Sequence, residues 1–547
     1  MTNPFDDIAK NAQCLFIIGS NTTEQHPVFG MQLRQAVKQR GVPLILADPR
    51  RIPIADYATI HLRHKPGTDT ALLNGLMYVL ITEDLYDHEF VANRTEGFEE
   101  LKAKILAYPP ERVAEICDVN AEDIRRAARL MAAHRPGALM YAMGITQHTS
   151  GHGNVISCAN LQMLLGNVGV AGGGVNPLRG QSNVQGSCDM GGLPNYYSGY
   201  QNVALEASHK KFEAAWGAVP PVDKPGLTLV EMMRAAEHGQ IKAMYILGEN
   251  PALSDPDSNH VRRCLAALDF LVVQDLFLTE TAQLADVVLP GASFAEKDGT
   301  FTNSERRVQR VQRALNPIGE CRPDWEIISD LGQRLLTAIW PELPDAIAEA
   351  PHGHWDYMNP VEILDEIADL TPSYAGIRAH RLEKLGSLQW PCPDEKHPGT
   401  PILHVGKFTR GLGKFQPMGY LPPAELPDES YPLLLTTGRV LYHYHTGSLT
   451  RRARGLAAIY PEGLIELHPE DAARLGVANG ETVEVASRRG RVHAKADVTE
   501  RVQPGVVFMT FHFPDSAANF LTNPALDPVA KIPEFKACAV RVSKCAV

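Results

Sequence analysis

The sequence predicts an α/β protein with two doubly wound α/β domains and a C-terminal β-barrel-like domain. Short apolar runs alternate with longer amphipathic segments near the start of the chain, and a similar group recurs between Ala243 and Arg307. Beyond a proline-rich segment, the pattern changes to short alternating strands with glycine turns, which is typical of a closed β domain. We expect the three domains to span residues 1–181, 182–425 and 426–547.

The first domain begins with two apolar runs, Cys14–Asn21 and Val42–Arg51, which flank the helical pattern FGMQLRQAVKQRG. A strand, a helix and a second strand within about thirty residues predict a parallel, doubly wound sheet. Such sheets bind ligands in the loops that leave the carboxyl ends of their strands. The loops Gly19–Pro27 and Asp48–Arg51 are therefore candidate ligand loops, although neither carries the G-x-G-x-x-G fingerprint.

A second α/β layer is indicated by three β-branched runs that each end in a polar loop: Ala243–Pro251, Phe270–Ala282 and Ala285–Arg307. The segment Trp390–Pro432 then holds nine of the chain's 40 prolines. That density predicts a boundary or linker.

The third domain contains three predicted strand regions, LLLTTGRVLYHYHT, ETVEVASRRGRVHAKADV and GVVFMTFHF. A short helix is expected between the first two, because Pro469 is suited to open a helix and Gly476 to end one. In the first region a strand period would place Arg439, Leu441, His443 and His445 on one face. The two histidines could ligate a metal or donate hydrogen bonds in a wet cleft.

Composition excludes several classes of protein. The 547 residues carry 52 basic and 63 acidic side chains, a net charge of −11, which argues against nucleic acid or an anionic membrane as the main partner. The sequence contains no run of 18 consecutive apolar residues, so it predicts no membrane span. Its polar first residues do not resemble a signal peptide. The nine cysteines lie at least seven residues apart, so no zinc or iron–sulfur spacing is present. We expect a cytoplasmic protein.

The segment Gly166–Gly192 is the most unusual in the chain. Nine of its 27 residues are glycine, and only Arg179 and Asp189 are charged. Backbone N–H groups in such a loop can approach an anion closely, and a single arginine among neutral donors suits a small carboxylate. A surface loop with a solvated arginine remains the alternative.

Other polar loops also follow apolar runs, including Met143–Gly153, LGENP and QDLFLTE. Their recurrence at the ends of several predicted strands predicts one large ligand that touches many loops. The basic pairs Arg50–Arg51, Arg306–Arg307 and Arg451–Arg452 could meet phosphates or be solvated. We find no P-loop, no Ser-His-Asp signature and no H-E-x-x-H motif.

The segment GVNPLRGQSNVQGSCDMGGLPNYYSGY (Gly174–Tyr200) closely resembles the corresponding loop of formate dehydrogenase catalytic subunits. These belong to the molybdenum/tungsten bis-pterin oxidoreductases, the dimethyl sulfoxide reductase family. The likeness covers essentially the whole chain, including MGITQHTSG, LGENP, TTGRVLYHYHTG and NPALDPVAKIPEFKACAVRV. Nitrate reductases of this family usually carry a T-G-Q-P-N-A-M-G type loop instead, so RGQSNVQG favours formate.

The resemblance implies that the α/β domains surround a bis-molybdopterin guanine dinucleotide with molybdenum or tungsten. Arg179 would hold formate as it is oxidised to CO2, and Gln181 would support the same pocket. No residue of this chain is expected to ligate the metal. The expected cofactor-binding residues are Gly19, Asn21, Asp48, Pro49, Arg50, Gly67, Asp69, Met143, Gly144, Gln147, Gly180, Gly248, Glu249, Asn250, Gln274, Asp275, Asp324, Arg439, Leu441, His443, His445, Thr446, Asn519 and Lys536.

Members of this family carry a Cys-rich [4Fe–4S] domain and a Cys or selenocysteine–His pair ahead of the region that this sequence resembles. We expect a separate polypeptide or a longer chain to supply them, unless catalysis has been lost. The expected partners are NAD-reducing subunits with FMN and iron–sulfur clusters. We expect neither nucleic acid nor a membrane as a partner. Two alternatives remain: a non-catalytic scaffold or electron-transfer subunit of the same fold, and a related oxidoreductase that acts on nitrate.

Overall fold

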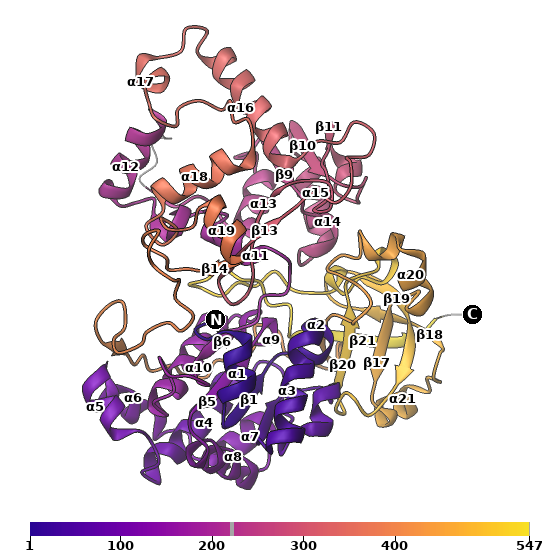
Figure 1. Cartoon of the computed structure of the whole chain (residues 1–547). Coiled ribbons are helices and arrows are strands. Elements are labelled where there is room, and N and C mark those ends of the chain that lie inside the picture. Colours follow the sequence, from indigo (N-terminus) through magenta and orange to yellow (C-terminus); the bar gives the residue numbers. More distant parts are fainter. Residues whose placement is uncertain (219–223, 546–547) are drawn as a thin grey trace. The chain divides into compact units, whose positions relative to one another are not determined.

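The computed structural model describes residues 1–218 and 224–545, and their contacts form two compact units (Figure 1). Unit 1 comprises Met1–Gly180, Asn250–Arg263 and Ile402–Val547, and unit 2 comprises Gln181–Glu249 and Cys264–Pro401. The first α/β layer and the C-terminal strands thus belong to one unit. The predicted division into three consecutive domains stays a prediction.

A five-stranded sheet in the order β3-β2-β1-β5-β6 forms the centre of the first α/β layer, and every neighbouring pair is parallel. Because β1 lies between β2 and β5, the strand order reverses direction at β1. Loops at the carboxyl ends of β1 and β5 therefore leave toward opposite sides of the sheet. The strands are β1 (Cys14–Ile18), β2 (Leu44–Ala47), β3 (Ile60–Leu62), β5 (Gly137–Tyr141) and β6 (Val175–Pro177).

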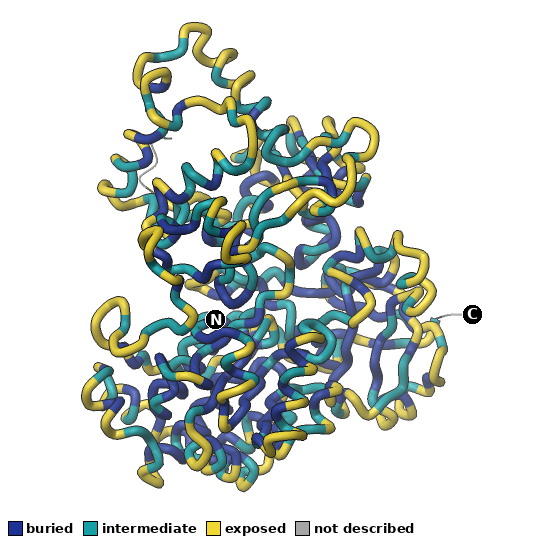
Figure 2. The backbone as a smooth tube through the Cα atoms, in the orientation of Figure 1, coloured by how far each residue is buried: buried dark blue, intermediate teal, exposed yellow. Residues whose placement is uncertain are grey.

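Both faces of this sheet are covered, as its nearly continuous apolar strands require. In β1, Phe16 and Ile18 pack in one hydrophobic core, whereas Leu15 and Ile17 pack in the core on the opposite face. Figure 2 shows the buried backbone in the interior of the unit. Helices α4, α8 and α10 contribute to the first core, and α1 and α3 to the second.

The predicted helix after β1 is confirmed as α3, with Pro27 in its first turn and Gly41 ending it at φ 68°, an arrangement that favours these two residues. The helices of this layer are α1 (Phe5–Asn11), α2 (Thr22–Gln25), α3 (Pro27–Arg40), α4 (Asp69–Thr82), α5 (His88–Arg94), α6 (Phe98–Ile105), α7 (Pro110–Cys117), α8 (Ala121–Ala133), α9 (Met143–Thr146) and α10 (Gly151–Leu164).

The C-terminal strands close into a six-stranded barrel in the order β16-β20-β17-β19-β18-β21, so the predicted α/β class with a C-terminal barrel is confirmed. The alternating apolar residues of these strands fill its interior. The predicted helix is α21 (Pro469–Leu475), which Gly476 ends. The other elements are β16 (Leu433–Gly438), β17 (Leu464–Leu467), β18 (Thr482–Ala486), β19 (Arg491–Val498), β20 (Val506–Thr510), β21 (Cys538–Lys544), α20 (Arg454–Ile459) and α14 (Pro251–Ser254).

One strand prediction is wrong. Strand β16 ends at Gly438, so Arg439, Leu441, His443 and His445 do not share a strand face. The chain leaves the barrel there because the pairing of β16 with β20 ends at Gly438. Two residues later, the Val440 N–H bonds to the His512 ring at 3.1 Å instead of to a neighbouring strand. Leu441 is consequently exposed while His443 is buried.

Unit 2 contains the second predicted α/β layer, a parallel three-stranded sheet in the order β11-β10-β9. An antiparallel sheet, β12-β13-β14, accompanies it. The strands are β7 (Tyr196–Tyr197), β8 (Gln201–Asn202), β9 (Ala243–Leu247), β10 (Phe270–Asp275), β11 (Val287–Pro290), β12 (Gly299–Thr302), β13 (Arg307–Val311) and β14 (Ser387–Gln389). The helices are α11 (Val184–Asp189), α12 (Glu206–Trp216), α13 (Leu229–Glu237), α16 (Asp324–Ile339), α17 (Asp345–Ala348), α18 (Pro360–Leu370) and α19 (Ala379–Leu385), while α15 (Ser258–Ala266) crosses the division between units.

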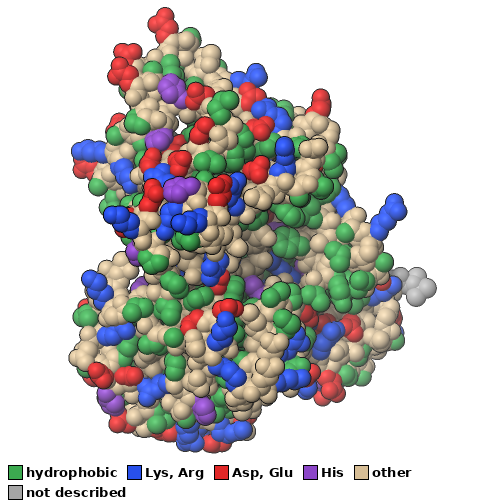
Figure 3. Space-filling view, in the orientation of Figure 1, with side chains coloured by type: hydrophobic (Ala, Val, Ile, Leu, Met, Phe, Trp, Pro, Cys, Tyr) green, Lys and Arg blue, Asp and Glu red, His purple; other side chains and the backbone are tan. Residues whose placement is uncertain are grey.

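The three-stranded sheet of unit 2 is covered on one face. On that face Leu271 and Val273 of β10 are buried, whereas on the other face Phe270 is 46% exposed. On the same face Leu247 of β9 and Val287 of β11 are also exposed, whereas Gln274 of β10, which pairs with Leu247, is fully buried. Figure 3 shows hydrophobic side chains at the surface over these strands. This face is therefore only partly covered, which is unusual for a parallel sheet.

The predicted linker Trp390–Pro432 is irregular in structure, with β15 (Gly413–Lys414) pairing with β4 (Thr95–Glu96). Among the described residues, no helix combines the length and apolar character needed to cross a bilayer. The nine cysteines are free thiols.

Candidate cofactor and substrate site

The main cavity of unit 1 lies at the carboxyl edge of the five-stranded sheet and encloses about 1030 Å³ of space that opens to solvent. Each strand of the sheet is followed by residues that line it. These residues are Gly19 after β1, Asp48 after β2, His64 after β3, Ala142 after β5 and Leu178 after β6. The reversal of strand order at β1 thus places the cavity where parallel α/β sheets bind ligands.

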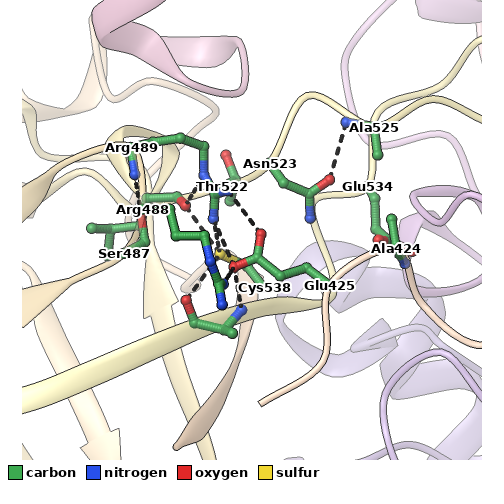
Figure 4. Close-up of polar contacts among 12 residues, drawn as sticks. Ala424, Glu425, Ser487, Arg488, Arg489, Thr522, Asn523, Ala525, Glu534 and Cys538 are labelled. Carbon is green, nitrogen blue, oxygen red and sulfur yellow. Dashed lines mark hydrogen bonds and ion pairs between the residues drawn. The ribbon is translucent and has the colours of Figure 1, made fainter. Parts of the chain in front are cut away.

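The barrel supplies the opposite wall. Thr436–Arg439 at the end of β16, Phe508 in β20, Phe511 and Lys536 all line the same cavity. The chain segment that carries Lys536 is fixed nearby by Glu534, whose side chain is fully buried. Glu534 accepts a hydrogen bond from the Ala424 N–H at 2.9 Å (Figure 4). It also accepts one from the Thr149 hydroxyl at 3.0 Å.

The two walls are joined by a buried ion pair. The Arg50 guanidinium donates to both oxygens of Glu466 in β17, at 2.9 and 2.6 Å, and lies 3.5 Å from the centre of the Phe508 ring. Burial lowers the pKa of Arg50, but the Glu466 carboxylate outweighs burial and raises it. Arg50 is therefore a charged, paired part of the wall rather than an open phosphate site.

Gly19 and Gly144 meet where the loops after β1 and β5 cross. The Gly144 N–H donates to the Gly19 carbonyl at 3.0 Å, and a Cβ added to Gly144 would lie 2.6 Å from the Gly19 Cα. Gly19 also has a φ of 57°, which favours glycine. These two glycines let the two backbones pack directly against each other at the cavity wall.

Acidic and basic groups face the cavity together. His64 Nε2 lies 2.8 Å from Asp69 Oδ1. Burial opposes ionisation of Asp69, but the nearby His64 prevails and lowers the pKa of Asp69. Burial lowers the pKa of Lys536 to about 7, and Arg439 and Arg50 act in the same direction. A bound anion would favour the charged lysine.

Several buried polar atoms of the cavity wall have no hydrogen-bond partner among the described residues. Neither amide atom of Asn21 has such a partner, and neither do Gln25 Nε2 and His148 Nδ1. Asp69 Oδ2 also accepts no hydrogen bond, although it lies 3.7 Å from His148 Nε2. Since buried polar groups are rarely left unpaired, this cluster fits a polar ligand. The cavity carries donors, acceptors and positive charge, as a phosphate-linked nucleotide requires.

More than half of the sequence-predicted cofactor residues lie in this one cavity. They are Gly19, Asn21, Asp48, Pro49, Arg50, Gly67, Asp69, Met143, Gly144, Gln147, Gly180, Arg439 and Lys536. Arg179 lies between two lining residues, Leu178 and Gly180, and is partly exposed. Gln181 belongs to unit 2, so its place in the pocket of Arg179 stays a prediction.

A second group of predicted residues gathers in unit 2 at the carboxyl ends of β9 and β10. Gln274 donates to Asp324 at 2.7 Å, and its backbone carbonyl accepts from the Gly248 N–H at 2.8 Å. Asp275 ends β10 beside them, and Glu249 follows Gly248. These five residues form a separate cluster whose cofactor role stays a prediction.

The remaining predicted residues hold loops together in this structure. Asn519 donates to the carbonyls of Leu253 and Ser254 at 3.0 and 2.8 Å, and Asn250 precedes the same helix, α14. His443 lies 2.7 Å from the Tyr460 carbonyl and 3.1 Å from the Thr450 hydroxyl. Among the described residues no metal-ligand cluster includes His443 or His445. Leu441, His445 and Thr446 lie in the loop after β16, outside the cavity lining.

The sequence prediction missed several lining residues. Gln25 and His26 lie in the loop Gly19–Pro27, which was predicted as a ligand loop, so a signal for them was present. His148 lies in another predicted loop. Thr436 and Gly438 lie in the segment TTGRVLYHYHTG, which carries the family resemblance, so a signal was present for them as well. Phe508 and Phe511 lie in a predicted strand region, and the sequence did not reveal that they line a cavity, because their position depends on barrel closure.

Comparison with known proteins gives consistent results. Residues 1–334 match the family Molybdopterin oxidoreductase, and residues 433–539 match Molydopterin dinucleotide binding domain. The chain is 48% identical over its full length, and over 78% of the relative, to F420-dependent formate dehydrogenase 1 subunit alpha of Methanococcus maripaludis. It is 35% identical to the Assimilatory nitrate reductase catalytic subunit of Bacillus subtilis, over 99% of the chain and 76% of the relative. Acetylene hydratase from Pelobacter acetylenicus shares the fold, with a TM-score of 0.75 at 23% identity over 99% of this chain and 79% of that structure.

Proposed function

Because the chain belongs to the molybdopterin oxidoreductase family, we propose that it is the large part of a formate dehydrogenase. The reaction converts formate into CO2, a proton and two electrons. The observation that carries the proposal is Arg179 within the Gly174–Tyr200 segment, at the edge of a cavity with unpaired polar atoms. The 48% identity to a protein named formate dehydrogenase supports it.

The charged and polar residues of the cavity suit different parts of a molybdopterin guanine dinucleotide. Asp48, Asp69 and the Asn21 amide suit the N–H donors of guanine. Arg439 and Lys536 suit phosphate oxygens. When bound, the group supplies a molybdenum or tungsten centre that accepts two electrons. A [4Fe–4S] cluster, expected on a portion ahead of this region, would carry these electrons onward.

Arg179 provides the substrate chemistry that the chain itself can perform. A guanidinium binds a carboxylate through two parallel N–H···O bonds. Formate is such a carboxylate, whereas CO2 is neutral and linear. Arg179 therefore holds and orients the substrate, and its affinity falls once the negative charge has gone.

The electron acceptor is a further part of the proposal. NAD-reducing partners were expected from the sequence, but the comparisons give NAD no support, since the relative described above is named F420-dependent. We therefore propose that partner subunits pass the electrons to coenzyme F420. Assays with F420, NAD and an artificial viologen acceptor, each with formate, distinguish these acceptors.

The decisive experiment measures molybdenum, tungsten and pterin in the enzyme purified with its iron–sulfur portion, and then Arg179→Ala in that enzyme. We expect Arg179→Ala to raise the formate KM at least 100-fold or abolish turnover, while metal and pterin content stay unchanged. Arg126→Ala, on the exposed surface of α8, is the matched control.

Absence of both metal and pterin from the wild-type enzyme would favour the scaffold alternative. Unchanged formate kinetics in Arg179→Ala would remove the substrate role of this residue. Reduction of nitrate by the enzyme, without formate oxidation, would instead favour a nitrate-reducing relative.

A further inference from the structure

We propose that His26 is a positioning residue that fixes the main chain of Arg179 and thereby aims its guanidinium at the substrate. This inference deepens the proposed function and rests on it. His26 Nε2 lies 2.7 Å from the Arg179 carbonyl oxygen, although the two residues are 153 positions apart in sequence. Both belong to unit 1.

His26 is itself held rigidly. It lies between α2 and α3, and its backbone N–H donates to the Thr22 carbonyl at 3.0 Å. Its carbonyl accepts from the Gly30 N–H at 2.8 Å. The next residue, Pro27, lies in the first turn of α3, where its ring fixes the backbone. The imidazole therefore projects from a junction of two helices with little backbone freedom.

The direction of the hydrogen bond follows from the partner. A carbonyl oxygen accepts, so Nε2 carries the proton and donates. Burial and the nearby Arg439 lower the pKa of His26, and the contact with Arg179 opposes them. Nδ1 is buried without a partner among the described residues. The neutral ring with its proton on Nε2 is the form that this arrangement selects.

One further hydrogen bond and one close approach involve the same stretch of chain. The Leu178 N–H donates to the Tyr141 carbonyl of β5 at 2.8 Å. On the far side, a Cβ added to Gly180 would lie 2.9 Å from Arg439 Nη1. The peptide between Arg179 and Gly180 thus lies between the α2–α3 junction and the barrel loop.

The hydrogen bond from His26 is expected to affect how the Arg179 side chain is oriented, and not the charge with which it binds the substrate. His26 contacts the main-chain carbonyl of Arg179, so its effect is on the position of the backbone that carries the guanidinium. Loss of the hydrogen bond would let the arginine move within the site, and a displacement of about 1 Å at a reacting centre can reduce a rate about 100-fold.

The test compares His26→Leu with His26→Gln in the complete enzyme. Glutamine keeps an N–H donor at a similar reach, whereas leucine removes the donor. We expect His26→Leu to lower kcat/KM for formate at least tenfold with metal and pterin content unchanged. His26→Gln should stay within about threefold of the wild type. His134→Leu, which removes an exposed histidine from the Leu130 carbonyl, is the matched control.

A double-mutant cycle separates positioning from general damage. If His26 acts through Arg179, adding His26→Leu to Arg179→Ala should reduce residual turnover by less than twofold. Additive losses, or equal losses in His26→Leu and His26→Gln, would overturn the inference. If the wild type and Arg179→Ala behave as proposed while His26→Leu is unchanged, the inference about His26 alone fails. If the wild type oxidises no formate, the proposed function fails.

Discussion

Lys536 shows how strongly one residue depends on its surroundings. A lysine in a protein surface titrates near 10.4, but the cavity wall lowers the pKa of Lys536 to about 7. Its ammonium donates to the Thr437 carbonyl at 2.7 Å. The cavity without a ligand thus holds a lysine that loses its charge near neutral pH.

We expect this lysine to make the stability of the ligand-free protein depend on pH. Between about pH 7 and pH 10 the unfolded chain holds the proton and the folded chain does not, so stability rises with pH. In Lys536→Met this contribution disappears. The unfolding free energy of the wild type minus that of the variant should therefore increase by up to about 1.4 kcal/mol per pH unit in that window.

The measurement is urea unfolding of the wild type and Lys536→Met between pH 6 and 9.5. Lys38→Met, at an exposed position of α3, is the matched control. A difference that stays constant with pH would contradict the lowered pKa.

At the residue scale, residues that directly follow a recognisable strand could be predicted to line a cavity. Gly19, Asp48 and Gly144 each follow the end of a strand, Gly144 within α9, and each lines the cavity. A hydrogen bond between segments far apart in the sequence could not be predicted. Nothing local to His26 reveals that its ring meets the Arg179 carbonyl.

At the scale of elements, the runs around Cys14, Val42, Ala243 and Phe270 were found because apolar β-branched runs alternate with polar turns. The end of β16 was missed, because the alternation LYHYH continues after the chain leaves the barrel. The periodicity of a sequence shows which side chains could alternate between the two faces of a strand. Where the strand ends depends on its hydrogen bonds to a neighbouring strand.

The open face of the three-stranded sheet gives an element-scale prediction. Phe270 and Leu271 are adjacent in β10 but face opposite sides, with exposures of 46% and 1%. We expect Leu271→Ala to destabilise unit 2 by about 2–5 kcal/mol because it leaves a cavity in the core. Phe270→Ala should cost less than about 1 kcal/mol.

Hydrogen exchange of the β10 amides in the two variants measures this difference, because faster exchange reports local destabilisation. Equal acceleration in both variants would mean that the Phe270 face is covered in solution. The exposed position of Leu335 on α16 provides a control, Leu335→Ala, outside the sheet.

At the scale of the whole molecule, unit 1 joins an α/β sheet and a barrel that are hundreds of residues apart in sequence. The pair of Arg50 and Glu466 connects them, with 12% and 7% of the side chains exposed. Arg501 adds a second contact to Glu466 at 3.1 Å. The sequence resemblance implied a shared ligand, but it did not reveal this direct connection.

We expect Glu466→Gln to destabilise unit 1 by about 3 kcal/mol, because it leaves a buried guanidinium without its counter-charge. Limited proteolysis and thermal unfolding of the ligand-free protein measure this effect. Glu470→Gln, on the exposed start of α21, is the control and should change the unfolding free energy by less than about 0.5 kcal/mol. Equal losses of unfolding free energy in both variants would contradict a stabilising role of the Arg50–Glu466 ion pair.

The joined walls also impose an order on biosynthesis. The cavity is lined both by Gly19 next to the sheet and by Lys536 next to the barrel. The ribosome therefore synthesises hundreds of residues after the sheet before the barrel side of the cavity is complete. The sheet can fold early during translation, since its strands lie within the first 180 residues, and domains tend to fold as they emerge. A ligand that touches both walls can be enclosed only afterwards, when the nascent barrel has closed.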